Sequence, residues 1–242
     1  MIKFRTHDSC SHTGHSGSMQ KKLLIFDLDG TLIDSAEDIV QTMNKTAKFF
    51  GESAIPSEVI RSQIGEGLLK LIQDLFPHRS DWTDIVQRFR QIYINEGLKH
   101  TVIYPDAVDF LQSWQGDLAM VTNKSEAPTH HVLKSLGLDQ IPWKSIIGGD
   151  TLSERKPHPL PLLTTLQRLN RRPEESLMIG DAFPDMRAAQ SAGIESIAIT
   201  FGYSKIEELR QYSPVAFLQS YKDLHQTIAS LNGRTKADID EE

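Results

Sequence analysis

The sequence predicts an α/β protein with a doubly wound parallel (Rossmann-like) sheet and an inserted all-helical cap. Short apolar stretches that end in polar or charged residues alternate with amphipathic helical patterns along most of the chain. Parallel strands need crossover connections, and helices must cover both faces of such a sheet. One long block after the first strand has helical spacing only, which predicts the insertion.

The first strand is predicted by a short apolar run that ends in Asp27-Leu28-Asp29-Gly30-Thr31. Side chains at positions i and i+2 of an extended chain point to the same side, so Asp27 and Asp29 can face one ligand. Two carboxylates held so close together need a cation. Gly30 permits a sharp turn, and Thr31 adds a hydroxyl group. Taken alone, this pattern is as typical of a strand followed by an Asp-Gly turn.

The helical block is expected to start at a capping box, Ser35-Ala36-Glu37-Asp38. The helix after it should end at Gly51, and two further helical patterns follow, the first ending at Pro77 and the second including Phe89. We expect no strand between residues 32 and 99.

After the block, strand and helix patterns alternate to the end of the chain. The expected strands are residues 118–121, 145–147, 177–179, 197–199 and 215–218. The predicted domains are a core of residues 21–34 and 100–232, a helical cap of residues 35–99, a disordered extension of residues 1–20 and a flexible acidic tail of residues 233–242.

Composition limits the classes of function. The chain has 242 residues, a single cysteine and a net charge of −6, which argue against a disulfide framework and a general nucleic-acid binder. No apolar run approaches the ~20 residues of a membrane helix, so we expect a cytoplasmic protein without a membrane partner. Monomer and homodimer are both compatible with the sequence.

The polar residues that follow the predicted strands form a pattern of their own. They are Asp27 and Asp29, Thr122 and Asn123, Asp150 with Lys156 downstream, and Asp181 with Asp185. Ligands bind outside the carboxyl ends of strands in such sheets, so these groups should converge. Ligands with oxygen donors alone suit Mg²⁺ better than zinc. A carboxylate nucleophile, a divalent ion and an ammonium group are the parts of a phosphoryl-transfer site.

Four motifs in this order resemble those of the haloacid dehalogenase superfamily of phosphohydrolases. They are Asp27-Leu28-Asp29-Gly30-Thr31, Thr122-Asn123-Lys124, Lys156-Pro157-His158-Pro159 and Gly180-Asp181-Ala182-Phe183-Pro184-Asp185. Any one motif is weak evidence, whereas four in order across most of the chain are specific. With Gly148-Gly149-Asp150 and Phe201-Gly202-Tyr203, the motifs look most like those of phosphoglycolate phosphatases. Pro184 departs from that subfamily, which usually has Asn there.

The resemblance implies a role for each site residue. Asp27 would be the nucleophile and a Mg²⁺ ligand, and Asp29 would be the general acid and base, with its backbone carbonyl on the metal. Asp181 would be the third metal ligand. Thr122, Asn123 and Lys156 would bind phosphate, and Asp185 would orient a metal-bound water or Lys156. Asp150 is as typical of a plain loop carboxylate as of a residue that supports the metal site from outside its ligand set.

The inserted helices would supply substrate selectivity. Gly65-Glu66-Gly67 is equally typical of a plain interhelix turn and of a substrate-facing loop whose N–H groups bind an anion. The other candidates for binding a substrate carboxylate are the cationic side chains of Arg61 and Lys70.

The sequence therefore predicts a phosphoric monoester hydrolase. We expect Mg²⁺-dependent hydrolysis of a small phosphorylated metabolite through an aspartyl-phosphate, with 2-phosphoglycolate as the substrate. A phosphomutase or an inorganic pyrophosphatase on the same core is the alternative enzyme. A phospho-accepting signalling receiver fits less well, because a receiver needs neither a second carboxylate at Asp29 nor a lid.

Overall fold

The computed structural model describes residues 20–96 and 98–233. Its centre is a six-stranded parallel sheet in the order β5-β4-β1-β6-β7-β8. The strands are β1 (Leu23–Phe26), β4 (Asp117–Val121), β5 (Trp143–Ile147), β6 (Ser176–Gly180), β7 (Glu195–Ile199) and β8 (Ala216–Leu218). This sheet confirms the predicted fold class.

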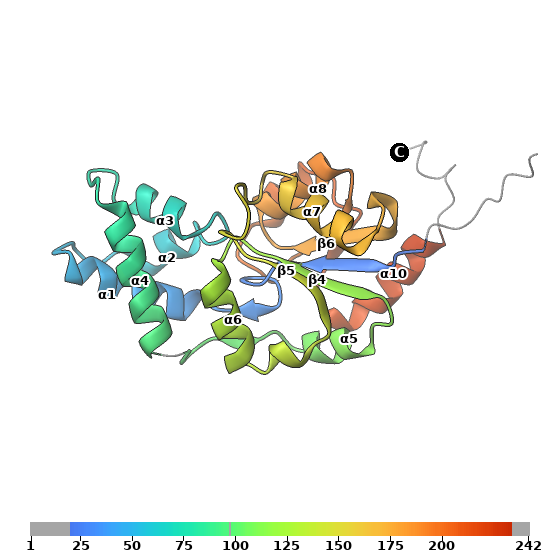
Figure 1. Cartoon of the computed structure of the whole chain (residues 1–242), viewed down its shortest axis with the longest axis horizontal. Coiled ribbons are helices and arrows are strands. Elements are labelled where there is room, and N and C mark those ends of the chain that lie inside the picture. Colours follow the sequence, from blue (N-terminus) through green and yellow to red (C-terminus); the bar gives the residue numbers. More distant parts are fainter. Residues whose placement is uncertain (1–19, 97, 234–242) are drawn as a thin grey trace, which may run out of the picture.

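Helices connect the strands and cover both faces of the sheet (Figure 1). They are α5 (Ala107–Ser113), α6 (Glu126–Ser135), α7 (Leu160–Leu169), α8 (Phe183–Ala192), α9 (Ile206–Arg210) and α10 (Leu224–Asn232), with short 3-10 turns η1 (Leu138–Gln140), η2 (Pro173–Glu175) and η3 (Tyr221–Asp223). Helices α5, α6 and α10 lie over one face, whereas α7 and α8 lie over the other.

The alternation of side chains along β1 divides the core into two layers. Leu24 and Phe26 pack with the residues of α5, α6 and α10, and Leu23 and Ile25 pack with those of α7 and α8. All four side chains are fully buried, as expected for a central strand of a sheet covered on both faces.

The strand order places β1 between β4 and β6. The chain builds β4 and β5 on one side of β1 and then returns to build β6, β7 and β8 on the other. A sheet binds ligands at such a reversal, outside the carboxyl ends of the strands. The residues that directly follow β1, β4 and β6 are therefore neighbours there.

Four helices lie beyond this end of the sheet, and we call them the helical block (Figure 1). They are α1 (Ala36–Phe49), α2 (Ser57–Arg61), α3 (Leu68–Leu75) and α4 (Trp82–Glu96). Their apolar faces pack on each other, with Met43, Ile72 and Phe89 among the buried residues. The helical spacing predicted α1, α3 and α4, but it did not predict the five-residue helix α2.

Two features at the start of the block differ from the sequence-based expectation. Strand β2 (Ile33–Asp34) lies within residues 32–99, where we expected none, and it pairs antiparallel with β3 (Val102–Ile103). A two-residue strand has too few residues to show a periodicity. The capping box also does not form, because the Ser35 side chain makes no cap hydrogen bond and donates instead to Asp29.

The expected terminal segments fall almost wholly outside the described residues, which leave out residues 1–19 and 234–242. Among the helices of the part that is described, none is long and apolar enough to cross a membrane. A cytoplasmic location stays a prediction.

The Asp38 carboxylate, in the first turn of α1, joins the segment that enters the helical block to the segment that returns from it to the sheet. Asp38 is buried and accepts hydrogen bonds from Thr101 N (2.8 Å), Thr101 Oγ1 (2.6 Å), His100 N (3.0 Å) and Lys99 N (3.1 Å). Burial alone would raise the pKa of Asp38, but these hydrogen bonds outweigh it and hold the pKa below 3.8. The ionised carboxylate thus holds the returning chain against α1.

We predict that Asp38→Asn lowers the free energy of unfolding at neutral pH by about 1–3 kcal/mol, because an amide nitrogen cannot accept these bonds. Since the folded-state pKa is lowered, the contribution of Asp38 is present above about pH 4 and is lost as the pH falls through the folded value. Urea unfolding at several pH values measures both effects.

The control is Glu37→Gln, which makes the same charge change on an exposed neighbour paired with Arg61. It should cost less than about 1 kcal/mol. Equal losses for the two variants, or an Asp38→Asn loss that does not shrink in acid, would contradict this role.

Candidate active site

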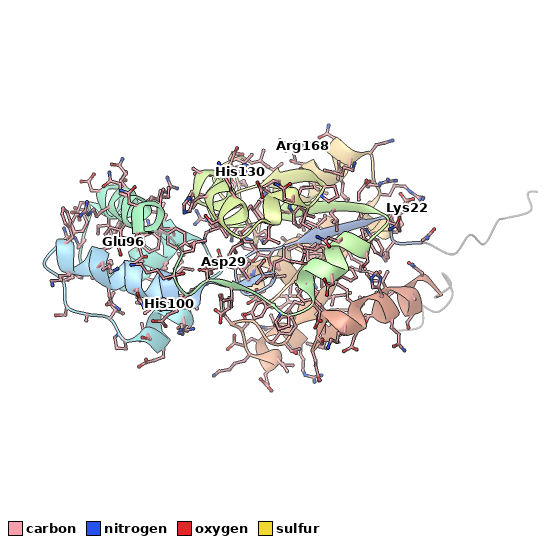
Figure 2. The ribbon with its side chains drawn as sticks, turned by 90° about the horizontal axis from the view of Figure 1, so that it is seen from below. Lys22, Asp29, Glu96, His100, His130 and Arg168 are labelled. Carbon is pink, nitrogen blue, oxygen red and sulfur yellow. The ribbon has the colours of Figure 1, made fainter. Side chains whose placement is uncertain are left out.

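The polar residues that follow β1, β4 and β6 come together at the end of the sheet that faces the helical block. Figure 2 shows Asp29 at this end, whereas Lys22 lies at the other end of β1. Asp27, Thr122 and Asp181 each come directly after one of these three adjacent strands. All three side chains are buried.

Lys156 is the centre of the site, although it comes from a loop and not from a strand end. Its side chain is 1% exposed, and Nζ lies 2.6 Å from Asp185 Oδ1, 3.0 Å from Asp27 Oδ1 and 2.6 Å from the Val121 carbonyl oxygen. Burial by itself would lower the pKa of Lys156, but the charges of Asp185 and Asp27 outweigh it and raise the pKa. Lys156 is therefore a cation at neutral pH.

Three buried carboxylates form a cluster here, and two of them, Asp27 and Asp185, contact this ammonium group. One oxygen each of Asp27, Asp181 and Asp185 can be chosen so that all three atoms lie within 4.8 Å of one another. Burial raises the pKa of Asp27 to about 6, although Lys156 opposes the rise. Burial, and then the charges of Asp185 and Asp27, raise the pKa of Asp181 well above 3.8. The cluster carries more negative charge than Lys156 can balance.

The hydrogen bonds of Asp181 fix both of its oxygens. Thr31 Oγ1 donates to Oδ1 at 2.9 Å, and the Tyr203 backbone N–H donates to Oδ2 at 2.8 Å. Gly30 has a φ of +81°, and a Cβ atom on it would come within 2.2 Å of Asp181 Oδ2; a Cβ on Gly202 would come within 2.3 Å of Asp181 Cβ. The turn after β1 thus requires glycine for two reasons, its left-handed backbone and its lack of a side chain.

Asp185 lies in the first turn of α8, where it contacts Lys156 directly. Its Oδ2 accepts from the Ala182 N–H at 3.1 Å. Pro184, which departs from the subfamily pattern, also lies in this first turn, where a backbone N–H would have no partner within the helix. The proline is therefore compatible with the helix start.

Asp29 has a different set of partners from Asp27. Lys124 Nζ lies 3.1 Å from both carboxylate oxygens of Asp29, and Ser35 Oγ donates to Oδ1. The same ammonium lies 4.7 Å from the ring centroid of Tyr93 in α4. Sequence reasoning gave Lys124, Ser35 and Tyr93 no role beside Asp29, because side-chain contacts between separate elements are not visible in the sequence.

Asn123 connects three segments of the site. Its Nδ2 donates to the Lys156 carbonyl oxygen at 2.8 Å and to the Gly65 carbonyl oxygen at 2.9 Å. The neighbouring Thr122 Oγ1 accepts from the Lys124 N–H at 3.2 Å. Asn123, which was predicted to bind phosphate, thus also sets the position of the Lys156 loop and of the Gly65 turn.

Asp150 does not join the acidic cluster. Its carboxylate is about half exposed, accepts from the Glu126 N–H at 2.7 Å and lies 3.3 Å from Arg90 Nη2. The loop after β5, an outer strand, places Asp150 at the rim of the site. The position of a residue directly after a strand is therefore not enough to predict that it joins the acidic cluster.

A cavity lies between the helical block and the end of the sheet. Asp27, Asp29 and Lys124 line one side, and Gly65, Gly67 and Arg90 are among the residues that line the other. Arg61 and Lys70, the two predicted cationic candidates, do not line it, because Arg61 pairs with Glu37 and Lys70 pairs with Asp74. Sequence reasoning did not name Arg90 as a cavity residue. Its place in α4 between Phe89 and Tyr93, which are both buried, was the signal that could have indicated it.

The donor set of the site fits a divalent cation. Three buried carboxylates face each other with one ammonium group between two of them, so a second positive charge would lower their mutual repulsion. The donors are oxygen atoms alone, as Mg²⁺ and Ca²⁺ prefer. Asp27 and Asp181 could bind such an ion, and Asp185 is close enough to orient it or Lys156.

Comparisons with known proteins agree with this chemistry. The family model for haloacid dehalogenase-like hydrolases matches residues 24–199. A phosphoglycolate phosphatase from Colwellia psychrerythraea is 34% identical over 217 residues, which are 85% of this chain and 96% of the relative. A phosphoglycolate phosphatase from Aquifex aeolicus is 35% identical over 188 residues, covering 76% of this chain and 87% of the relative.

Solved structures show the same fold. A protein from Haemophilus somnus described as a predicted phosphoglycolate phosphatase has a TM-score of 0.77 and 26% identity, covering 86% of this chain and 97% of its own. A haloacid dehalogenase-like protein from Streptococcus pneumoniae has a TM-score of 0.76 and 26% identity, covering 85% and 97%. The resemblance predicted from the four motifs is confirmed, and the chain is an enzyme that belongs to the haloacid dehalogenase-like hydrolases.

Proposed function

We propose that this hydrolase is a Mg²⁺-dependent phosphatase that cleaves 2-phosphoglycolate or a closely similar carboxylated phosphomonoester. The observation that carries the proposal is the pair of carboxylates after β1. Asp27 lies against Lys156, whereas Asp29 lies against Lys124, and both line one cavity. Two neighbouring carboxylates with different partners can perform two different steps of one reaction.

In the first step, Asp27 attacks the phosphorus atom and forms an aspartyl-phosphate, while Asp29 donates a proton to the leaving oxygen. In the second step, Asp29 takes a proton from a water molecule, whose oxygen attacks the phosphorus atom; the bond to Asp27 breaks, which releases phosphate and restores the Asp27 carboxylate. Thr122, Asn123 and Lys156 are the groups that hold the phosphate oxygens. Lys124 and Ser35 hold the Asp29 carboxylate in place for both proton transfers.

Mg²⁺, held by Asp27, the Asp29 carbonyl and Asp181, would neutralise and orient the phosphate oxygens. The chain's own contribution is to keep these ligands fixed without it. Thr31 and Tyr203 hold Asp181, and Lys156 holds Asp27. These contacts would keep the ligands in nearly the same positions before and after Mg²⁺ binds.

We further propose that residues 35–99 act as a cap that closes the cavity over the substrate. The helical block faces the sheet end through Gly65, Arg90 and Tyr93. A closed cavity excludes bulk water, which strengthens the electrostatic interactions inside. The names of the relatives and the two cations in this cavity favour a small substrate with a carboxylate in addition to its phosphate over the mutase and pyrophosphatase alternatives.

Replacement of each carboxylate should separate the two roles. Asp27→Asn should abolish phosphate release, because an amide cannot serve as the nucleophile. Asp29→Asn should lower kcat by ~10²–10⁴ because it removes the general acid and base. Steady-state release of inorganic phosphate from 2-phosphoglycolate measures both variants.

Turnover by Asp27→Asn close to that of the unchanged enzyme would refute the assignment of the nucleophile. Release of one equivalent of glycolate without turnover in the unchanged enzyme, with the phosphoryl group kept on Asp27, would instead indicate a receiver. Faster hydrolysis of pyrophosphate or sugar phosphates than of 2-phosphoglycolate would move the protein to one of the alternative functions.

The raised pKa values of Asp27 and Asp181 predict pH-dependent metal binding. Below about pH 6 Asp27 is increasingly protonated, and the raised pKa of Asp181 acts in the same direction, so Mg²⁺ must displace protons to bind. Without metal, the proton bound to Asp27 stabilises the folded state. This stabilisation is lost as the pH rises through about 6. The increase in melting temperature caused by Mg²⁺ should therefore be larger at about pH 7.5 than at about pH 5.

Asp181→Asn is the matched variant for this measurement, because it removes one proposed ligand and one negative charge. Its melting temperature should respond less to Mg²⁺ at the higher pH. A response equal to that of the unchanged protein, or full activity in EDTA, would show that the acidic cluster does not bind the ion.

A further inference from the structure

The cavity beside the acidic cluster is lined by two cationic side chains of the described residues, Lys124 and Arg90. Lys124 is balanced by Asp29, which it contacts through both carboxylate oxygens at 3.1 Å. Arg90 has a much weaker partner, because Nη2 lies 3.3 Å from a single oxygen of the half-exposed Asp150. The positive charge of Arg90 is therefore the less neutralised of the two.

The hydrogen-bonding capacity of Arg90 is also incompletely used. Nη2 donates to Ser125 Oγ, and Nε is buried without a hydrogen-bond partner. A guanidinium group offers five N–H donors in a planar fork that matches the two oxygens of a carboxylate. A buried donor without a partner costs free energy, so a ligand that accepts from it gains affinity.

The position of Arg90 suits the far end of a short substrate. Arg90 lies one helical turn before Tyr93, and the Tyr93 ring covers the ammonium of Lys124, which holds Asp29. The reacting phosphate belongs beside Asp27 and Asp29. A molecule with a phosphate at one end and a carboxylate two bonds further on would thus extend from the acidic cluster toward the helical block.

We propose that Arg90 binds the carboxylate of the substrate and thereby selects carboxylated phosphomonoesters. This inference rests on the proposed function and adds the residue that makes the selection. The other cationic candidates are less suited, because Arg61 and Lys70 pair with Glu37 and Asp74 and do not line the cavity. Arg90 acts in binding, so its loss should appear chiefly in KM.

A purely structural role for Arg90 makes a different prediction. Arg90 also crosses from the helical block to Ser125 and Asp150 beside the sheet, so it could serve only to hold the cap closed. Loss of a closed cap would slow every substrate alike. Loss of a carboxylate-binding group would slow only substrates that carry a carboxylate.

The test compares 2-phosphoglycolate with ethyl phosphate, which has the same length but a methyl group in place of the carboxylate. Arg90→Gln should raise KM for 2-phosphoglycolate by about 10- to 100-fold, the range for lost hydrogen bonds to a charged group. The fall in kcat/KM should be at least about tenfold larger for 2-phosphoglycolate than for ethyl phosphate. Arg90→Lys should recover part of the loss, because it keeps the charge but not the fork.

Two variants serve as controls. Arg88→Gln makes the same substitution on the same helix, where the Arg88 guanidinium lies 4.1 Å from the centroid of the Phe49 ring. This variant should leave the ratio of kcat/KM for the two substrates unchanged. Ser125→Ala removes a partner of Arg90 on the sheet side but leaves the cation, so the ratio should also stay close to that of the unchanged enzyme.

Each remaining outcome overturns the inference in a recognisable way. Equal losses on both substrates in Arg90→Gln and Arg90→Lys, or a Ser125→Ala variant that loses as much as Arg90→Gln, would show that Arg90 only holds the cap and would leave the proposed function intact. An unchanged enzyme that does not prefer 2-phosphoglycolate over ethyl phosphate would overturn both the inference and the proposed substrate.

Discussion

A buried ammonium group among buried carboxylates is the constraint on which the site depends. Lys156 is 1% exposed, and a charge so far from water is tolerated only with charged and hydrogen-bonding partners around it. Asp27 and Asp185 supply these partners at 3.0 and 2.6 Å. Since Asp181 adds a third carboxylate, one ammonium does not balance the cluster, and the imbalance is what makes the site attractive to a further cation.

This crowding of charge also explains where the backbone must lack side chains. A Cβ on Gly180 would come within 2.4 Å of the Asp185 carboxylate, and a Cβ on Gly30 or Gly202 would overlap Asp181. Three segments from different parts of the chain, the turn after β1, the end of β6 and the loop at Gly202, thus approach the same two aspartates. The glycines allow Asp181 and Asp185 to lie beside β1 with their hydrogen bonds complete, so the geometry exists before any ligand binds.

Most of the fold and the floor of the site follow from local patterns. The carboxyl ends of β1, β4 and β6 place Asp27, Thr122 and Asp181 close together at one end of the sheet. The periodicity of the long helices is also evident in the sequence. The rest depends on packing between distant segments. Arg90 meets Ser125, and Tyr93 meets Lys124, only because the helical block lies over the sheet end; the Arg61–Glu37 pair depends on packing between helices of the block.

The helical block and the reacting residues are linked through hydrogen bonds as well as through the cavity. The Asn123 amide joins the Gly65 turn to the loop of Lys156, and Lys124 lies between the Tyr93 ring and Asp29. A movement of the block would therefore remove one partner from each of two groups that position the carboxylates. If the block acts as the proposed cap, the arrangement that encloses a substrate is also the one in which Asn123 and Lys124 have all of these partners, which would couple substrate enclosure to the alignment of the reacting groups.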